Sequence, residues 1–196
     1  MAGGALRELL TATRRSSALA VWGRAAALAF FSLWGLKLSA QPIEAASQSF
    51  MHYVNLPMHE AGHIIFSPLG SFMQVLGGTL MQLLMPLVAL AALLLQNRDA
   101  FGASLAGWWL GENFIDAAPY IGDARAGQLL LLGGVTGRQA PGFHDWSNIL
   151  GGLGWLEYDR ILAYASFWLG AALMLASTAW GGYVLYLHFR ELRECP

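Results

Sequence analysis

Residues 55–70 read NLPMHEAGHIIFSPLG, and they place two histidines and a glutamate in the order HExxH, as His59, Glu60 and His63. The residues directly after this motif, IIF at positions 64–66, are typical of an apolar helix buried in lipid. Ionisable side chains inside a membrane segment cost free energy and therefore mark candidate functional sites. The stretch predicts a polar site built into a membrane helix.

The composition of the whole chain favours a membrane protein. Of its 196 residues, 56% are hydrophobic and 12% are charged, whereas ordinary soluble domains carry about 25% charged residues. The net charge of −1 gives no sign of nucleic-acid binding, so we expect no nucleic-acid partner. The single cysteine, Cys195, excludes an internal disulfide and a cysteine-based zinc site. We therefore expect one integral-membrane domain over residues 1–196, with the lipid bilayer as a partner.

Apolar segments long enough to cross a bilayer recur along the chain. A spanning helix needs about 20 mostly apolar residues. The candidate segments are residues 21–38, 50–66, 72–95, 101–120 and 161–188. The apolar run QLLLLGGV at 128–135 is too short to span and is expected to be re-entrant or interfacial. The prediction is an all-α fold, a polytopic transmembrane helical bundle with about five or six membrane segments.

The distribution of arginines bears on orientation. By the positive-inside rule, Arg7, Arg14 and Arg15 predict that residues 1–20 are cytoplasmic. Arg190 and Arg193 predict the same location for the C-terminus. Two cytoplasmic ends need an even number of crossings, whereas five segments are apparent. Either the 128–135 region also crosses, or one end departs from the rule.

The HExxH motif has a specific chemical meaning on a helix. His59 and His63 are four residues apart, so they share one face and can hold one zinc ion. Glu60 then lies beside the open position of the metal and can accept a proton from a metal-bound water. Asn55 is expected to cap this helix, with Pro57 in its first turn. The alternative is that both histidines are neutral and bond to neighbouring helices, with Glu60 at a water-exposed end.

A catalytic zinc usually has three protein ligands, so a third must come from elsewhere. The candidates are His52, Asp116, Asp123 and His144. In the stretch at 111–126, GENFIDAAPYIGDARA, the polar residues at positions 113, 116, 120 and 123 follow helical spacing and would turn one polar face inward. The alternative for Asp123 is a salt bridge to Arg125 or another arginine.

A third polar cluster is PGFHDWSNILG, residues 141–151. His144 and Asp145 could serve as a metal ligand, as a group that orients a ligand, or as a carboxylate–histidine pair. The alternative is a surface turn in which Asp145 caps a helix and Trp146 anchors at the membrane interface.

Taken together, these residues resemble the site-2 protease class of intramembrane zinc metalloproteases, over about residues 50–126. That class has a core of three helices, the first of which carries HExxH. The segment GGTLMQ at 77–82 resembles the glycine-containing motif of the second helix. Asn113, Pro119 and Asp123 appear in the order found on the third, with longer spacing and with Ala124 in place of a glycine.

The resemblance implies hydrolysis of a peptide bond within or near the bilayer, with Zn2+ as the cofactor. It implies that His59, His63 and Asp123 hold the zinc, with Asp116 or His144 as the other third ligands to consider. Glu60 would be the general base, and Asn113 would bond the substrate backbone or the oxyanion. The substrate would be a transmembrane or membrane-proximal protein segment, and the location the inner membrane of a bacterium. Two other functions stay open: a zinc hydrolase acting on a lipid amide or ester, and a membrane scaffold with a vestigial site.

Overall fold

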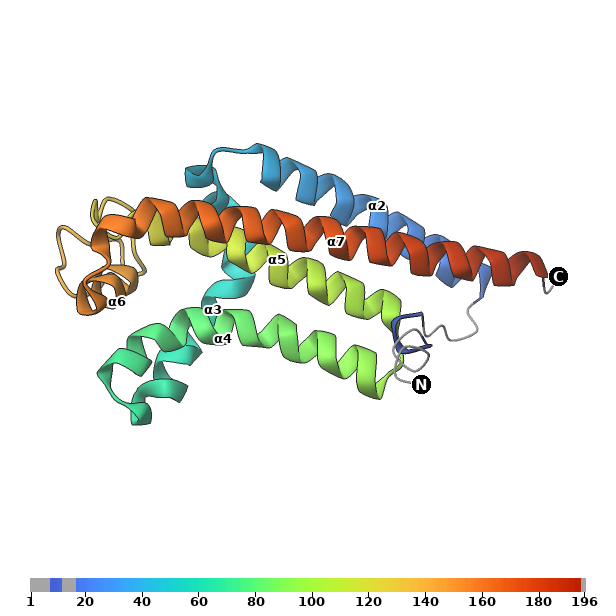
Figure 1. The fold of residues 1–196 in the computed structure, drawn as a ribbon, viewed down its shortest axis with the longest axis horizontal. Coiled ribbons are helices and arrows are strands. Elements are labelled where there is room, and N and C mark those ends of the chain that lie inside the picture. Colours follow the sequence, from blue (N-terminus) through green and yellow to red (C-terminus); the bar gives the residue numbers. More distant parts are fainter. Residues whose placement is uncertain (1–7, 12–16, 195–196) are drawn as a thin grey trace.

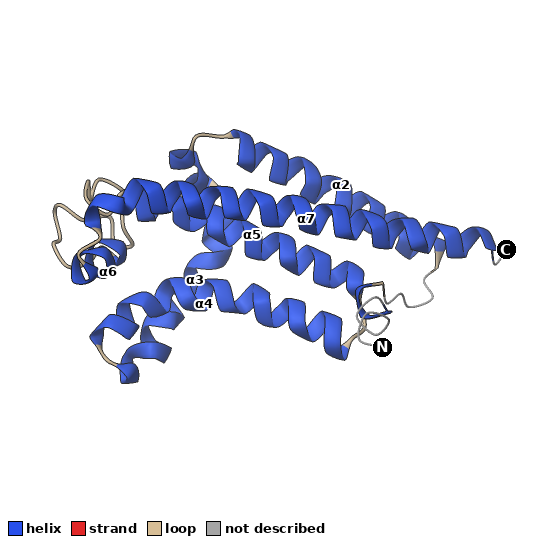
Figure 2. Cartoon of the chain, in the orientation of Figure 1, coloured by secondary structure: helices blue, strands red, loops and turns tan. Residues whose placement is uncertain are grey.

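The computed structural model describes residues 8–11 and 17–194, so the expected cytoplasmic segment, residues 1–20, lies mostly outside the described residues. Within these ranges every regular element is a helix, and the only strand-like feature is an isolated bridge between Leu130 and Thr136 (Figure 2). The all-α prediction is confirmed.

Four long helices alternate in direction along the molecule (Figure 1). They are α2 (Ala18–Ala40), α4 (Ser71–Ala91), α5 (Ala100–Gly122) and α7 (Asp159–Glu194). The shorter elements are the 3-10 turns η1 (Ile43–Gln48), η2 (Ser67–Leu69) and η4 (Leu156–Tyr158), the π-turn η3 (Ala92–Gln96), and the helices α3 (Phe50–Phe66) and α6 (Asp145–Leu153). As a result, α2 begins and α7 ends at the same end of the molecule (Figure 1).

Three helical segments are long and apolar enough to cross a membrane. They are Ala18–Ala40, Ser71–Gln96 and Leu156–Glu194, which correspond to the first, third and last predicted segments. The other two predicted segments, α3 and α5, form helices where expected but are not apolar enough to qualify. In α5 the polar side chains of Glu112, Asn113 and Asp116 lower the mean hydropathy, and all three are buried in the protein.

The helix α5 forms the centre of the molecule and packs along α7, with α2 against both (Figure 1). The backbones of α5 and α7 come so close that a Cβ atom on Gly111 would lie 2.7 Å from the Gly170 carbonyl oxygen. Trp108, Phe167 and Met174 fill the core around this crossing. By contrast, the outer faces of α2 and α7 expose many large apolar side chains, as a helix facing lipid would.

The helix α3 crosses from this layer to α4, and the two pack as a pair (Figure 1). At their crossing a Cβ atom on Gly62 would overlap the Gly77 carbonyl oxygen, so only glycine allows this approach. The helix begins at Phe50 with Ser49 as its N-cap, so the expectation that Asn55 caps it is wrong. Asn55 lies inside α3 and is buried, and Pro57 is also inside the helix.

The chain between α5 and α6 folds into turns at one end of the molecule (Figure 1). Residues 128–135, predicted to be re-entrant or interfacial, form no helix there. They bend back through the Leu130–Thr136 bridge, and Gly133 and Gly134 both have positive φ, which glycine adopts without strain. Their path brings leucine side chains toward α3 and α4, where the polar residues gather.

A candidate metal centre at the meeting of α3, α4 and α6

The HExxH residues lie together on the face of α3 that turns toward α4 and α6. The ring centroids of His59 and His63 are 4.9 Å apart. Ligand atoms of His59, Glu60 and His63 all lie within 4.8 Å of one another, close enough to hold one metal ion. The i, i+4 spacing therefore has the expected effect in three dimensions.

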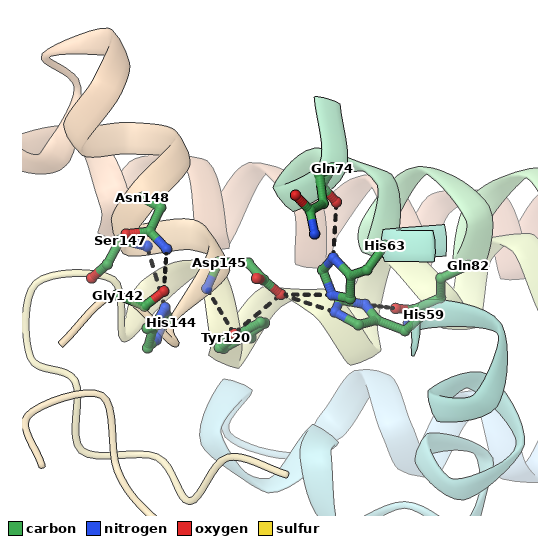
Figure 3. Close-up of polar contacts among 10 residues, drawn as sticks. All are labelled: His59, His63, Gln74, Gln82, Tyr120, Gly142, His144, Asp145, Ser147 and Asn148. Carbon is green, nitrogen blue, oxygen red and sulfur yellow. Dashed lines mark hydrogen bonds and ion pairs between the residues drawn. The ribbon is translucent and has the colours of Figure 1, made fainter. Parts of the chain in front are cut away.

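Hydrogen bonds fix the orientation of both imidazoles (Figure 3). The Nδ1 atom of His59 lies 3.2 Å from the Gln82 side-chain oxygen, and the Nδ1 atom of His63 lies 2.9 Å from the Gln74 backbone oxygen. Both partners are carbonyl oxygens, which only accept hydrogen bonds, so each Nδ1 carries the proton. In the neutral form of each ring, Nε2 is then the unprotonated nitrogen.

The third group at this point is Asp145, the first residue of α6 (Figure 3). Its Oδ2 atom lies 3.0 Å from Nε2 of His59 and 3.4 Å from Nε2 of His63. Burial raises the pKa of the Asp145 carboxyl, but hydrogen bonds with the two histidines outweigh it and lower the pKa to about 2. These three atoms converge, and when both imidazoles are neutral a cation or a proton must lie between them.

The start of α6 is built to hold Asp145 in this place. The Asp145 backbone N–H donates to the Tyr120 hydroxyl at 2.9 Å, and that hydroxyl lies 3.3 Å from Asp145 Oδ2. His144 is the N-cap of α6, with its Nδ1 accepting from the Ser147 N–H at 3.2 Å. Its ring also lies against Tyr120, with centroids 4.3 Å apart. Tyr120 and His144 are therefore supports for Asp145.

Asp123, the third ligand implied by the family resemblance, is engaged elsewhere. Its carboxylate accepts from the backbone N–H groups of Gln128 at 2.9 Å and Leu129 at 2.8 Å, and it faces Nε2 of His144 at 3.3 Å. Burial lowers the pKa of His144 despite this carboxylate, so the imidazole is neutral at pH 7. The geometry thus favours Asp145 over Asp123 as the third ligand, because Asp123 closes the turn after α5 instead.

The other ligand candidates also have different partners. His144 lies with its ring between Tyr120 and Asp123, as described above. Asp116 contacts neither HExxH histidine and accepts from His52 Nδ1 at 2.9 Å, from Asn55 at 3.1 Å and from Gln82 at 2.9 Å. His52 is therefore tied to Asp116. Since Gln82 in turn contacts His59, Asp116 reaches the candidate centre through an intermediate side chain.

Two further expectations do not agree with the structure. Asn113 is fully buried, donates to the Trp109 carbonyl oxygen at 2.9 Å and does not line the cleft at the candidate centre, so a contact with substrate is not supported. Arg125 pairs with Asp159 at 2.6 Å rather than with Asp123. The side chain of Asp159 is almost completely buried, which explains why it attracts the guanidinium group.

The helix α4 provides the floor of the centre. A Cβ atom on Gly78 would lie 2.6 Å from His59 Nε2 and 2.7 Å from His63 Nε2. Glycine therefore leaves a space at the point toward which both unprotonated nitrogens face. Gln82, which holds His59, lies one turn further along the same face of α4.

The centre opens into a cleft of about 910 Å³. The cleft is lined by the polar side chains of the centre, Glu60 among them, and by an apolar wall formed by residues 129–132 and Phe143. Leu130, Leu132 and Phe143 are largely exposed. The arrangement places polar groups for chemistry next to a surface suited to an apolar substrate.

Sequence reasoning missed two members of the polar network behind the centre. Asn55 donates to Glu112 at 2.9 Å and accepts from the Trp109 indole at 2.9 Å. The available signal was the placement of Asn55 and Glu112 within apolar helices, because a buried polar group requires a partner. Comparisons with protein-family models, with curated proteins and with solved structures find no match to this chain.

Proposed function

We propose that this chain is an intramembrane zinc metalloprotease that hydrolyses a peptide bond in a membrane-embedded or juxtamembrane protein segment. One observation carries the proposal: Nε2 of His59, Nε2 of His63 and Oδ2 of Asp145 converge, while both Nδ1 atoms are held by carbonyl oxygens. When both imidazoles are neutral, these three atoms are all acceptors, and a cation between them would satisfy all three.

The donor set fits zinc. Two imidazoles and one carboxylate form a ligand set found in catalytic zinc sites, with a fourth position left open. Ligand atoms about 2.0–2.1 Å from a tetrahedral ion are about 3.3 Å apart, and the separations from Asp145 Oδ2 to the two nitrogens are 3.0 and 3.4 Å. When bound, zinc would act as a Lewis acid and lower the pKa of a coordinated water to about 7.

The residues of the chain supply the rest of the chemistry. Glu60 lines the cleft beside the histidines, where its carboxylate can accept a proton from the attacking water and pass it to the leaving amine. The Tyr120 hydroxyl, bonded to Asp145, also lines the cleft and lies where it can orient a carbonyl group of the substrate.

The substrate class follows from the surroundings of the cleft. Its apolar wall at residues 129–132 suits a hydrophobic peptide segment. We infer a polytopic bundle in which α3 and α5 lie at membrane depth among the three apolar segments, because their polar groups face one another inside the protein. If α2, α4, α5 and α7 each cross, their alternating directions (Figure 1) agree with both ends being cytoplasmic in a bacterial inner membrane, as the positive-inside rule predicts.

The same apolar wall also suits an acyl chain, so a lipid amide or ester is the second candidate substrate. The two classes share the polar centre and differ only in what fills the apolar side of the cleft.

The test begins with metal content. We expect about one zinc per chain by elemental mass spectrometry in detergent-purified protein, lost in His59→Ala and retained in Glu60→Gln. Membranes from cells carrying Glu60→Gln should then accumulate a protein that the wild type cleaves, whereas Glu157→Gln, outside the cleft, should behave as wild type. Accumulation of a lipid instead would favour the second substrate class. Wild-type protein without zinc, purified without chelator and with zinc supplied, would overturn both.

A further inference from the structure

The buried network behind His59 has one acceptor at its centre. Asp116 is 5% exposed and receives hydrogen bonds from three side chains on two helices: His52 and Asn55 on α3 and Gln82 on α4. It lies on α5, and α3 is joined to α5 largely through these polar contacts. A carboxylate has no proton to offer, so every partner must approach it with a donor.

This requirement fixes the amide of Gln82. Its Nε2 atom lies 2.9 Å from Asp116 Oδ2, so the amide oxygen must point the other way, to His59 Nδ1 at 3.2 Å. An oxygen at Nδ1 in turn requires that Nδ1 carries the proton of His59. The unprotonated nitrogen is then Nε2, the atom beside Asp145.

We propose that Asp116 is a positioning residue that sets the tautomer and orientation of His59 through the side-chain amide of Gln82. The inference rests on the proposed metal centre and deepens it. It explains why His59, one of the proposed ligands, has its proton on Nδ1 and leaves Nε2 free to bind the metal. In metal sites, partners behind a ligating histidine typically change metal affinity by about 10- to 100-fold when they are removed.

The test exchanges the carboxylate of Asp116 with the side-chain amide of Gln82. Asp116→Asn can turn its own amide toward Gln82 and reverse the Gln82 amide, which would place a donor at His59 Nδ1 and make Nε2 carry the proton. We expect this variant to bind zinc about 10- to 100-fold more weakly in competition with a chelator. Adding Gln82→Glu exchanges amide and carboxylate, so that Glu at position 82 accepts from both neighbours. We expect the double variant to recover most of the lost affinity.

Glu112→Gln is the matched control, because it removes a buried carboxylate one turn earlier on α5 that contacts Asn55 but not Gln82. Its zinc affinity should stay close to that of the wild type. Equal losses in Asp116→Asn and Glu112→Gln, or no recovery in the double variant, would overturn the proposal and leave a role in packing only.

A second readout is independent of metal. In zinc-free protein labelled with 15N-histidine, at alkaline pH where the imidazoles are neutral, His59 should carry its proton on Nδ1, and Asp116→Asn should move it to Nε2. A proton on Nε2 in the wild type would contradict the inference even if the variants fail to fold. If wild-type protein binds no zinc but shows the Nδ1 tautomer, the proposed function fails and the positioning role stands.

Discussion

Two partly buried polar clusters lie among the apolar helices of this molecule, and they differ in how donors, acceptors and charges are paired. At one end Arg24 donates to His188 Nε2 at 2.8 Å, lies 3.9 Å from Asp99 and covers the Phe101 ring at 5.6 Å. There a cation meets an acceptor, an anion and an aromatic face.

The cluster around His59, His63 and Asp145 is different. Its supporting hydrogen bonds are satisfied, yet the three atoms at its centre are all acceptors when the imidazoles are neutral. Complementary polar groups in a helical bundle hold helices together, whereas acceptors arranged around Gly78, where a Cβ atom would lie 2.6 and 2.7 Å from the two Nε2 atoms, could hold a cation. The contrast distinguishes a cluster that contains its own cation from the candidate metal centre.

The largest expected effect distinguishes the two aspartates near the centre. Asp145→Ala should weaken zinc binding by more than about 100-fold, because it removes a proposed ligand, whereas Asp123→Ala should weaken it by about 10-fold through the turn and His144. Chelator competition measures both affinities. A greater loss in Asp123→Ala would return the third ligand to the position that the family resemblance implies.

The next effect concerns the floor of the centre. Gly78→Ala should weaken zinc binding by about 10- to 100-fold, because its Cβ atom would lie 2.6 and 2.7 Å from the two Nε2 atoms. Gly152→Ala is the control, since nothing lies within 4 Å of a Cβ atom there. Unchanged affinity in Gly78→Ala would mean that no ion occupies this space.

Mutations in the cluster around Arg24 should lower the stability of the protein and leave metal binding unchanged. Arg24→Met should lower the free energy of unfolding by about 1–3 kcal/mol, because it leaves the partly buried Asp99 and the buried His188 without their cation. Thermal unfolding in detergent measures this loss, and zinc content should stay that of the wild type. A loss of zinc in this variant would show that the two clusters are coupled.

The smallest expected effect is a pH dependence at His144. Burial lowers the pKa of His144 below its ordinary value of 6.5, so the unfolded chain takes up this proton first as the pH falls. Stability from this group is therefore present above pH 6.5 and declines below it. In zinc-free protein, the difference in unfolding free energy between wild type and His144→Asn should change by at most about 1.4 kcal/mol per pH unit. A difference that does not change with pH would indicate that His144 is not buried as a neutral ring.

The sequence by itself determined the helices and one face of the centre. Helix 50–66 has the predicted bounds, and the long helices agree with prediction to within a few residues except at the C-terminal end of α7, because apolar runs and turn residues act locally. His59 and His63 come together for the same reason, since the geometry of one helical turn places them on one face. Apolar composition indicated the membrane, and three segments meet its requirement.

Only the tertiary structure decided the rest of the site. Asp145 is 86 residues from His59 in the chain, and its position depends on the path of the turns between α5 and α6, which no periodicity describes. Asn55 suited a helix cap by residue type, but buried partners on α5 hold it inside α3 while Ser49 caps the helix. Likewise α5 became an interior helix because its carboxylates find donors on α3 and α4. Helical periodicity specifies the face of a helix on which a side chain lies, whereas contacts between residues far apart in the chain specify which groups that face packs against.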